Sequence, residues 1–355
     1  MRRLAMCASV LLLAACGGSS TSPSGASAPA AAKAGAAAAS AAPGAPERDQ
    51  VTSAYGTTTG SSAPLWLGVE KGFFGKHGLN VKLEYAQSSA TNAALLANEA
   101  QFGISDAPAT FTADAAGASL RIIAAMNKSN PYAIVVRPEI KTAADLKGKS
   151  LALAKPGDTS DVSARMALTP LGLQIGTDVT ALSVGNSGPR LAALLSGQVA
   201  GAILSEAFVE QAVSQGMHVL VSLEQAKIPY IANGVIVTQS FAKANPNAVL
   251  AYLKGLIEAV RFYADESKKA ESMAVLATYF KTNVNDPAVD SNYRFYHARL
   301  AHDLFPDKEG ADTPLDALKS IDPTRYANTN SDSIIDPSFM TTIRSSGFQK
   351  SVWGE

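Results

Sequence analysis

The stretch that decides the fold is Val81–Ile104, which reads VKLEYAQSSATNAALLANEAQFGI. Its first five residues alternate between apolar and polar side chains, the pattern typical of a half-buried strand. A helix is expected to open at Ser88 or Ser89, and a second short strand follows at Phe102–Ile104. A strand, a helix and a strand in this order predict an α/β fold with open, mostly parallel sheets.

The alternation of strands and helices continues in both directions along the chain. Further strands are predicted at these ranges: Val51–Tyr55, Leu120–Ala124, Ser150–Ala154, Val179–Val184, Ala200–Leu204 and His218–Leu223. The final third is mainly helical and starts at Asn245–Pro246, since asparagine caps a helix and proline fits its first position. The chain after Gln50 is long enough for two lobes of about 100–200 residues each.

The N-terminus has the pattern of a targeting segment. Arg2 and Arg3 precede the uncharged run Leu4–Ala15, which is shorter than the roughly 20 residues of a membrane-spanning helix. Residues 1–15 are therefore predicted to be a secretory signal. Leu13-Ala14-Ala15-Cys16 resembles the lipobox of bacterial lipoproteins, in which the cysteine carries lipid after cleavage. The alternative is an ordinary signal peptide with a cysteine at its cleavage site.

Residues 16–50 consist almost entirely of Ala, Gly, Ser and Pro and are predicted to be a flexible tether. The second cysteine, Cys7, lies in the signal, so a lipid on Cys16 leaves the body without a thiol for a disulfide, a nucleophile or a metal site. No later stretch is apolar enough to span a membrane, and the lipid is expected to be the only membrane attachment.

The charge of the chain excludes one class of partner. Thirty basic and thirty acidic residues cancel. Without a basic block there is no electrostatic case for binding nucleic acid. The four histidines are scattered, and glycine-rich phosphate-binding patterns are missing. No enzyme activity, cofactor or metal site is therefore expected.

Four stretches in a fixed order resemble the substrate-binding lipoproteins of bacterial ABC importers, of the nitrate, sulfonate, taurine and thiamine-pyrimidine-precursor type. The stretches are Ala63–Phe74 with Gly78–Val81, then Ala94–Gly103, Ala144–Lys149 and Leu191–Ala202. The match covers roughly Val51 to Leu223 and weakens beyond. It implies an α/β, two-lobed, type II periplasmic-binding-protein-like fold with two crossovers and the ligand in the cleft between the lobes.

The resemblance also implies boundaries and partners. Lobe one would comprise residues 51–130 plus 234–355, lobe two residues 138–223, and the crossovers residues 131–137 and 224–233. The protein would bind a small-molecule solute, close as a hinge, and dock as a monomer on a permease with its ATPase. The alternatives are a ligand-sensing lipoprotein for a membrane signalling partner, or an enzyme of the same fold.

Small polar residues mark the candidate ligand site. In open α/β folds ligands lie beyond the carboxyl ends of strands, where helices begin. Two turns from each lobe supply candidates there: Thr58, Ser61 and Ser62; Ser88 and Ser89; Asp158, Thr159 and Ser160; Asn186 and Ser187. Capping of the following helix explains each of these side chains equally well.

Further candidates come from the ends of strands and from the crossovers. Trp66 is either a pocket wall or a core residue, and Asp106 either faces the pocket or caps a helix. Glu206 follows a predicted strand, whereas Tyr132 and Asn233 lie near the crossovers.

The family's ligands imply an anionic or zwitterionic solute. Arg190 is the cation that could reach the cleft, whereas Arg165 is expected at the surface or between the lobes. The acidic candidates Asp106, Asp158 and Glu206 would instead suit an amine.

Overall fold

The computed structural model describes residues 44–354 apart from Gln87 and Glu206, and only the backbone of Ser88, Ser89 and Ala207. The chain divides into Met1–Ser40 and Ala41–Glu355, and the following account concerns the second unit. The predicted signal, the lipid on Cys16, most of the tether, Glu206 and the side chains of Ser88 and Ser89 lie outside the described residues.

The first sheet has five strands in the order β2-β1-β3-β10-β4. β10 runs antiparallel to both β3 and β4, and β1 pairs in parallel with β2 and β3. The bounds are β1 Gln50–Tyr55, β2 Asn80–Tyr85, β3 Phe102–Ser105, β4 Leu120–Ser129 and β10 Pro229–Thr238. The sheet is therefore mostly parallel, with one reversed strand that comes from far along the chain.

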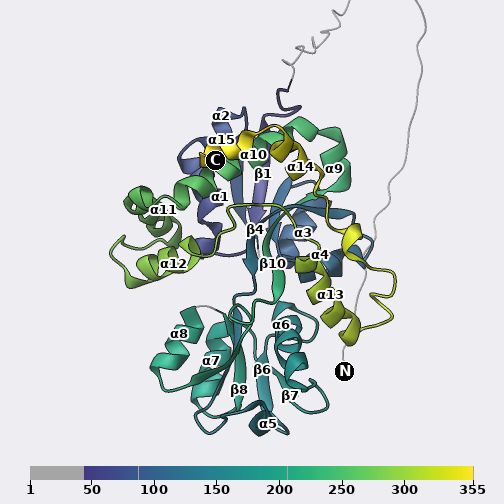
Figure 1. Cartoon of the computed structure of the whole chain (residues 1–355), viewed down its shortest axis with the longest axis vertical. Coiled ribbons are helices and arrows are strands. Elements are labelled where there is room, and N and C mark those ends of the chain that lie inside the picture. The colour runs from purple at the N-terminus through teal and green to yellow at the C-terminus, as the bar shows by residue number, and fades with distance from the viewer. Residues whose placement is uncertain (1–43, 87, 206, 355) are drawn as a thin grey trace, which may run out of the picture. The chain divides into compact units, whose positions relative to one another are not determined.

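The second sheet repeats this plan in the order β7-β6-β8-β5-β9. β5 is the reversed strand, and β6 pairs in parallel with β7 and β8. The bounds are β5 Tyr132–Val136, β6 Ser150–Leu153, β7 Thr180–Ser183, β8 Gly201–Ser205 and β9 His218–Ser222. Figure 1 shows β6, β7 and β8 together with the helices α6 Thr159–Leu168, α7 Ser187–Leu195 and α8 Ala207–Ser214.

The chain passes between the sheets twice. It leaves the first sheet after Ser129, enters the second at Tyr132, and returns between β9 and β10. Buried Asn130 fixes the outward passage, because its Oδ1 accepts from the backbone N–H of Tyr132 at 3.0 Å and its Nδ2 donates to Ser163 Oγ at 3.0 Å. These bonds tie the passage to helix α6 of the second sheet.

Three apolar clusters hold the helices on the sheets. The first contains residues of α1 Ala63–Glu70, α2 Phe73–Lys76, α9 Gln239–Ala244, α10 Pro246–Tyr263, α11 Lys269–Phe280, α12 Pro287–His297 and α14 Ser338–Ser345, with α15 Phe348–Trp353 packed against it. The second contains residues of α3 Ser88–Leu96, α4 Ala107–Asp114, α5 Ala143–Leu146, α6 Thr159–Leu168 and α13 Glu309–Ile321. The third lies under α7 Ser187–Leu195 and α8 Ala207–Ser214. Short 3₁₀ turns complete the fold at Gly60–Ser62, Thr169–Leu171, Glu266–Lys268 and Ser331–Ser333.

The second cluster is continuous across both sheets. It joins Phe111 of α4, Val162 of α6 and Leu315 of α13 with residues of both β4 and β6. α13 contacts α4 and α6 directly. Apolar packing therefore links the two halves of the body along this side.

Two local expectations differ from the structure. β1 begins at Gln50, and Glu47 accepts hydrogen bonds from the backbone N–H groups of Asn247 and Ala248 at the start of α10. The ordered body therefore extends into the end of the predicted tether. Ser62 does not cap α1, because its hydroxyl donates to the carbonyl of Thr57 at 2.8 Å.

Candidate functional site

A pocket of about 160 Å³ lies where the ends of strands from both sheets meet. Some of its lining residues lie just after β1 and β3 or at the end of β8. Another begins the helix that follows β6, and others lie on the passages between the sheets. The lining residues are Thr57, Thr59, Ser61, Asp106, Pro131, Tyr132, Thr159, Ser205, Tyr230, Ala232, Asn233 and Tyr296. These strands present their carboxyl ends, the edge at which open α/β folds bind ligands.

Hydroxyl groups form the wall after β1. Ser61 Oγ lies 2.8 Å from Thr59 Oγ1 and 3.3 Å from Thr57 Oγ1. Thr59 also donates to the hydroxyl of Tyr296 at 3.3 Å, which brings α12 to the pocket. Gly60 permits this approach, because a Cβ there would lie 2.7 Å from both the carbonyl oxygen of Asn292 and the ring of Tyr296.

Asp106 follows β3 and joins the two halves of the pocket. Its Oδ1 accepts from the backbone N–H of Ala109 at 2.8 Å and so caps α4. Its Oδ2 accepts from Thr159 Oγ1 at 2.7 Å, and Thr159 begins α6 of the second sheet. Desolvation raises the pKa of Asp106, with a further contribution from the Asp158 carboxylate, although both hydrogen bonds act to lower it. Asp106 therefore caps a helix and lines the pocket at once.

Tyr230 and Asn233 of the returning strand form another side of the pocket. The side chain of Tyr230 is 1% exposed, and its hydroxyl has no hydrogen-bond partner among the described residues. Burial raises the pKa of this hydroxyl well above its usual value, the Asp106 carboxylate raises it further, and the Ser163 side chain acts to lower it. A buried polar atom without a partner is rare in folded proteins and calls for an explanation.

A chain of polar groups lies behind the wall after β8. Ser205 Oγ is 3.1 Å from Ser187 Oγ, and Arg190 Nη2 donates to Ser187 Oγ at 2.8 Å. The Arg190 side chain is 3% exposed, and its Nε and Nη1 have no partner among the described residues. Burial lowers the pKa of Arg190, while the Tyr132 and Asp158 groups act to raise it. A guanidinium thus lies one residue behind the pocket wall.

The structure brings five of the predicted site residues to this pocket: Ser61, Asp106, Tyr132, Thr159 and Asn233. Ser187 contacts the lining through Ser205. Asp158 caps α6, and Ser160 donates to Asp158 and accepts from Ala154 N. Neither of these two side chains lines the pocket.

Four other predicted residues do not line the pocket, and the first of them, Ser62, is buried and donates to the carbonyl of Thr57. Trp66 is 0% exposed and stacks on Tyr279 with ring centroids 4.5 Å apart, so it occupies the core position and not the pocket wall. Thr58 and Asn186 are exposed at turns, and neither lines the pocket.

Sequence reasoning missed seven lining residues, among them Ser205, Tyr230 and Tyr296. Ser205 ends β8, so the rule that selected Asp106 after β3 would have found it. Tyr296 lies on a helix whose spacing indicated only an apolar face, and its sequence position gives no sign of the pocket.

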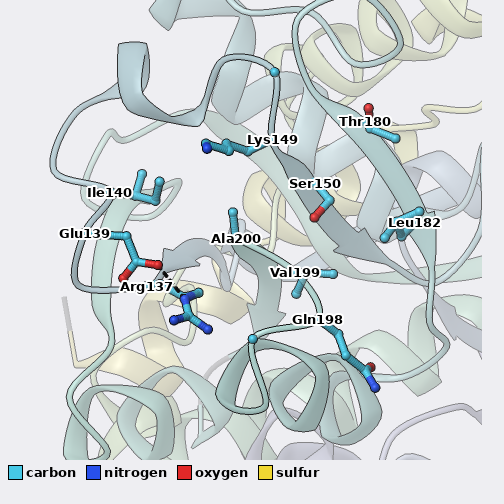
Figure 2. A pocket seen from close by; sticks show the side chains of 12 residues that line it. Arg137, Glu139, Ile140, Lys149, Ser150, Thr180, Leu182, Gln198, Val199 and Ala200 are labelled. Carbon is cyan, nitrogen blue, oxygen red and sulfur yellow. Dashed lines mark hydrogen bonds and ion pairs between the residues drawn. The ribbon is translucent and has the colours of Figure 1, made fainter.

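A larger hollow lies at the opposite end of the second sheet (Figure 2). Ser150 and Thr180 begin β6 and β7 there, so this hollow lies at the amino ends of the strands. Arg137 pairs with Glu139 at 2.6 Å, as the dashed line in Figure 2 shows. Because ligands of open α/β folds bind at the carboxyl ends of the strands, the smaller pocket is the better candidate despite its size.

Among the described residues, no three side chains of His, Cys, Asp or Glu are grouped as a metal ion requires. In the same part of the chain, no helix combines the length and apolarity needed to cross a bilayer.

Two mixed α/β sheets, two passages between them and a pocket at their shared carboxyl edges define the two-lobed fold of periplasmic binding proteins. Solved structures agree. The periplasmic aliphatic sulphonate binding protein SsuA from Escherichia coli superposes with a TM-score of 0.67 at 20% identity, covering 82% of this chain and 93% of its own. The periplasmic nitrate-binding protein NrtA from Synechocystis PCC 6803 gives a TM-score of 0.63 at 18% identity, covering 85% and 90%. These likenesses establish the fold.

The sequence places the chain in a family within this fold. The NMT1/THI5-like family model matches residues 59–270, more than half of the chain. The chain therefore belongs to the NMT1/THI5-like family, as the resemblance to nitrate- and sulfonate-type binding proteins implied. No curated protein sequence matches it.

Proposed function

We propose that this protein is the extracytoplasmic solute-binding subunit of an ABC importer. The observation that carries the proposal is the pocket built from the carboxyl ends of both sheets, with the hydrogen bond from Thr159 to Asp106 across it. Two lobes that share one ligand site close when the solute bridges them. The binding proteins NrtA and SsuA, which share the fold, are periplasmic.

The lobes we propose are residues 51–130 with 234–355, and residues 138–223, connected by the two passages. The solute binds between them without covalent change. The closed monomer then docks on a permease with its ATPase, and lipid on Cys16 keeps it at the membrane. Of the predicted anionic and zwitterionic solutes, the zwitterion fits the lining better, because Asp106 is acidic and no basic side chain lines the described pocket.

Ligand capture tests this function. The purified protein is denatured, and the released small molecules are identified by mass spectrometry and added back to ligand-free protein in a thermal-shift assay. A solute that is recovered unchanged and raises the melting temperature is expected, because binding to the folded state stabilises it. Recovery of a chemically converted product would contradict a pure binding role.

Membrane attachment has a separate test. The variant Cys16→Ser should leave the membrane fraction and appear as soluble, exported protein. A variant that still sediments with membranes after washing without detergent would refute the lipid anchor, while the binding role would stand.

A further inference from the structure

The pocket is acidic. Asp106 is the one charged side chain among the described residues that line it. No lysine, arginine or histidine among the described residues pairs with this carboxylate, whose two bonded partners are a backbone N–H and a hydroxyl. A carboxylate removed from water without a cation costs free energy. The site therefore favours a ligand that brings a positive charge.

Three tyrosine side chains line the same space. Tyr132, Tyr230 and Tyr296 come from the outward passage, from β10 and from α12, and all three line the pocket. The face of an aromatic ring attracts cations electrostatically, more strongly where water is excluded. Tyrosine rings beside a single carboxylate form a favourable environment for an organic cation.

The Tyr230 hydroxyl indicates which kind of cation. It is buried and makes no hydrogen bond of normal geometry with the described residues, and it lines the same pocket as Asp106. A phenol oxygen accepts a hydrogen bond, so a group with N–H donors can satisfy both Tyr230 and Asp106. A quaternary ammonium has no such donor and would leave the hydroxyl without a partner.

We propose that the pocket recognises a protonated amine, which donates to the Asp106 carboxylate and to the Tyr230 hydroxyl and lies among the tyrosine rings. This inference rests on the proposed solute-binding function and names the chemistry of its ligand. The amine is the end of the solute that contacts the first lobe.

The opposite wall suits an oxyanion. Arginine can only donate hydrogen bonds, so Ser187 accepts from Arg190 and its own proton is free to point to Ser205. The proton of Ser205 can then point into the pocket. The Cζ atom of Arg190 also lies 6.0 Å from the ring centroid of Tyr132, and the guanidinium, whose Nε and Nη1 have no hydrogen-bond partner among the described residues, places positive charge behind this wall. The solute class is therefore a small zwitterion with an amine at one end and a carboxylate or sulfonate at the other.

Matched ligands test the inference. Isothermal titration of the full chain with β-alanine, propanoate, 2-aminoethanesulfonate, ethanesulfonate and ethylamine, and with homologues one carbon longer, separates the amine from the anion. At least one zwitterion should bind about 10- to 150-fold more tightly than its deaminated counterpart, the factor expected for hydrogen bonds to a charged group.

Two variants assign the effect to residues. Asp106→Asn should abolish the preference for the aminated ligand, while asparagine still caps α4. Tyr230→Phe should weaken amine binding by about 2- to 12-fold without loss of stability, because its hydroxyl has no hydrogen-bond partner of normal geometry among the described residues. The matched controls are Asp286→Asn, which alters the exposed cap of α12, and Tyr252→Phe, which breaks a buried 2.8 Å bond to Ser53. Tyr252→Phe should lower stability and leave affinity unchanged.

The outcomes separate this inference from the proposed function. If deaminated anions bind as tightly as the zwitterions, or if the solute recovered from the protein has no basic nitrogen, the amine assignment is overturned and the solute-binding role stands. An unchanged ligand preference in Asp106→Asn overturns it as well. A protein that binds neither these ligands nor any component of a cell extract overturns both.

Discussion

Asp106→Asn should make the ligand-free protein more stable at neutral pH, although it removes a charge from the proposed site. The carboxylate keeps only neutral partners, Ala109 N–H and Thr159 Oγ1. Its pKa is nevertheless raised, so desolvation outweighs these bonds. Asparagine offers a comparable cap and carries no charge.

The gain in stability follows from the thermodynamic link between proton binding by Asp106 and folding. Each unit by which the folded-state pKa exceeds the unfolded value corresponds to about 1.4 kcal/mol of lost stability at neutral pH. The variant also loses some favourable interaction with the start of α4, about 0.3–1 kcal/mol. We expect a net gain in stability, and each 1 kcal/mol of it corresponds to about 2–4 °C in melting temperature for a domain of 150–250 residues.

The pH dependence gives the sharper test. Because the folded-state pKa of Asp106 is raised, its protonated form stabilises the fold at pH values below the unfolded pKa. That contribution is lost as pH rises through the folded-state pKa. The advantage of Asp106→Asn should therefore be absent near pH 3 and grow as pH approaches neutrality.

The assay is thermal unfolding of protein refolded free of ligand and followed by circular dichroism across this pH range. Asp286→Asn is the matched control with the opposite sign, because hydrogen bonds from Thr282 and Ala288 lower the pKa of Asp286. That variant should be no more stable than the parent at neutral pH. A melting temperature for Asp106→Asn at or below the parent's at pH 7, with native secondary structure, would refute the reasoning.

Three further changes test other parts of the structure. Trp66→Ala should destabilise the fold by about 3–5 kcal/mol in urea unfolding and leave solute affinity intact, and a selective loss of affinity would return Trp66 to the pocket wall. Gly60→Ala should cost about 1–3 kcal/mol and weaken solute binding by moving Tyr296, and a variant with parental affinity would show that α12 does not shape the site. Glu47→Gln should lower the melting temperature at neutral pH but not at acid pH. Partial burial acts to raise the pKa of Glu47, but the bonds from Asn247 and Ala248 outweigh it and lower the pKa, so this stabilisation is present above the unfolded value and lost as pH falls.

The α/β pattern could be read from the sequence because strand and helix periods are local. The alternation in Asn80–Tyr85 and the cap at Asp106 depend only on neighbouring residues. The order of strands is different, since β10 inserts between β3 and β4 from more than a hundred residues away. The family resemblance, not the residue pattern, supplied the two-lobed arrangement.

The candidate site was predictable where a turn directly follows a strand. Asp106 and Ser61 illustrate this, and the unrecognised Ser205 obeys the same rule. Tyr296 reaches the pocket only through the close packing of α12 on Gly60. Such a contact depends on tertiary packing over a long separation in sequence, which no local pattern encodes. Trp66, placed between Leu65 and Leu67, belonged to a continuously apolar segment, and this was a sign of the core.

The apolar cluster shared by α4, α6 and α13 has a consequence for how a solute enters. Separating the lobes along that side would expose Phe111, Val162 and Leu315 to water, and each large side chain so exposed costs about 1.5–3 kcal/mol. The part of the pocket that is lined by the hydroxyls of Thr59 and Ser205 can be hydrated at little cost. If the lobes open, the cluster should keep them together on its own side, and we expect the solute to enter where Thr59 and Ser205 line the pocket.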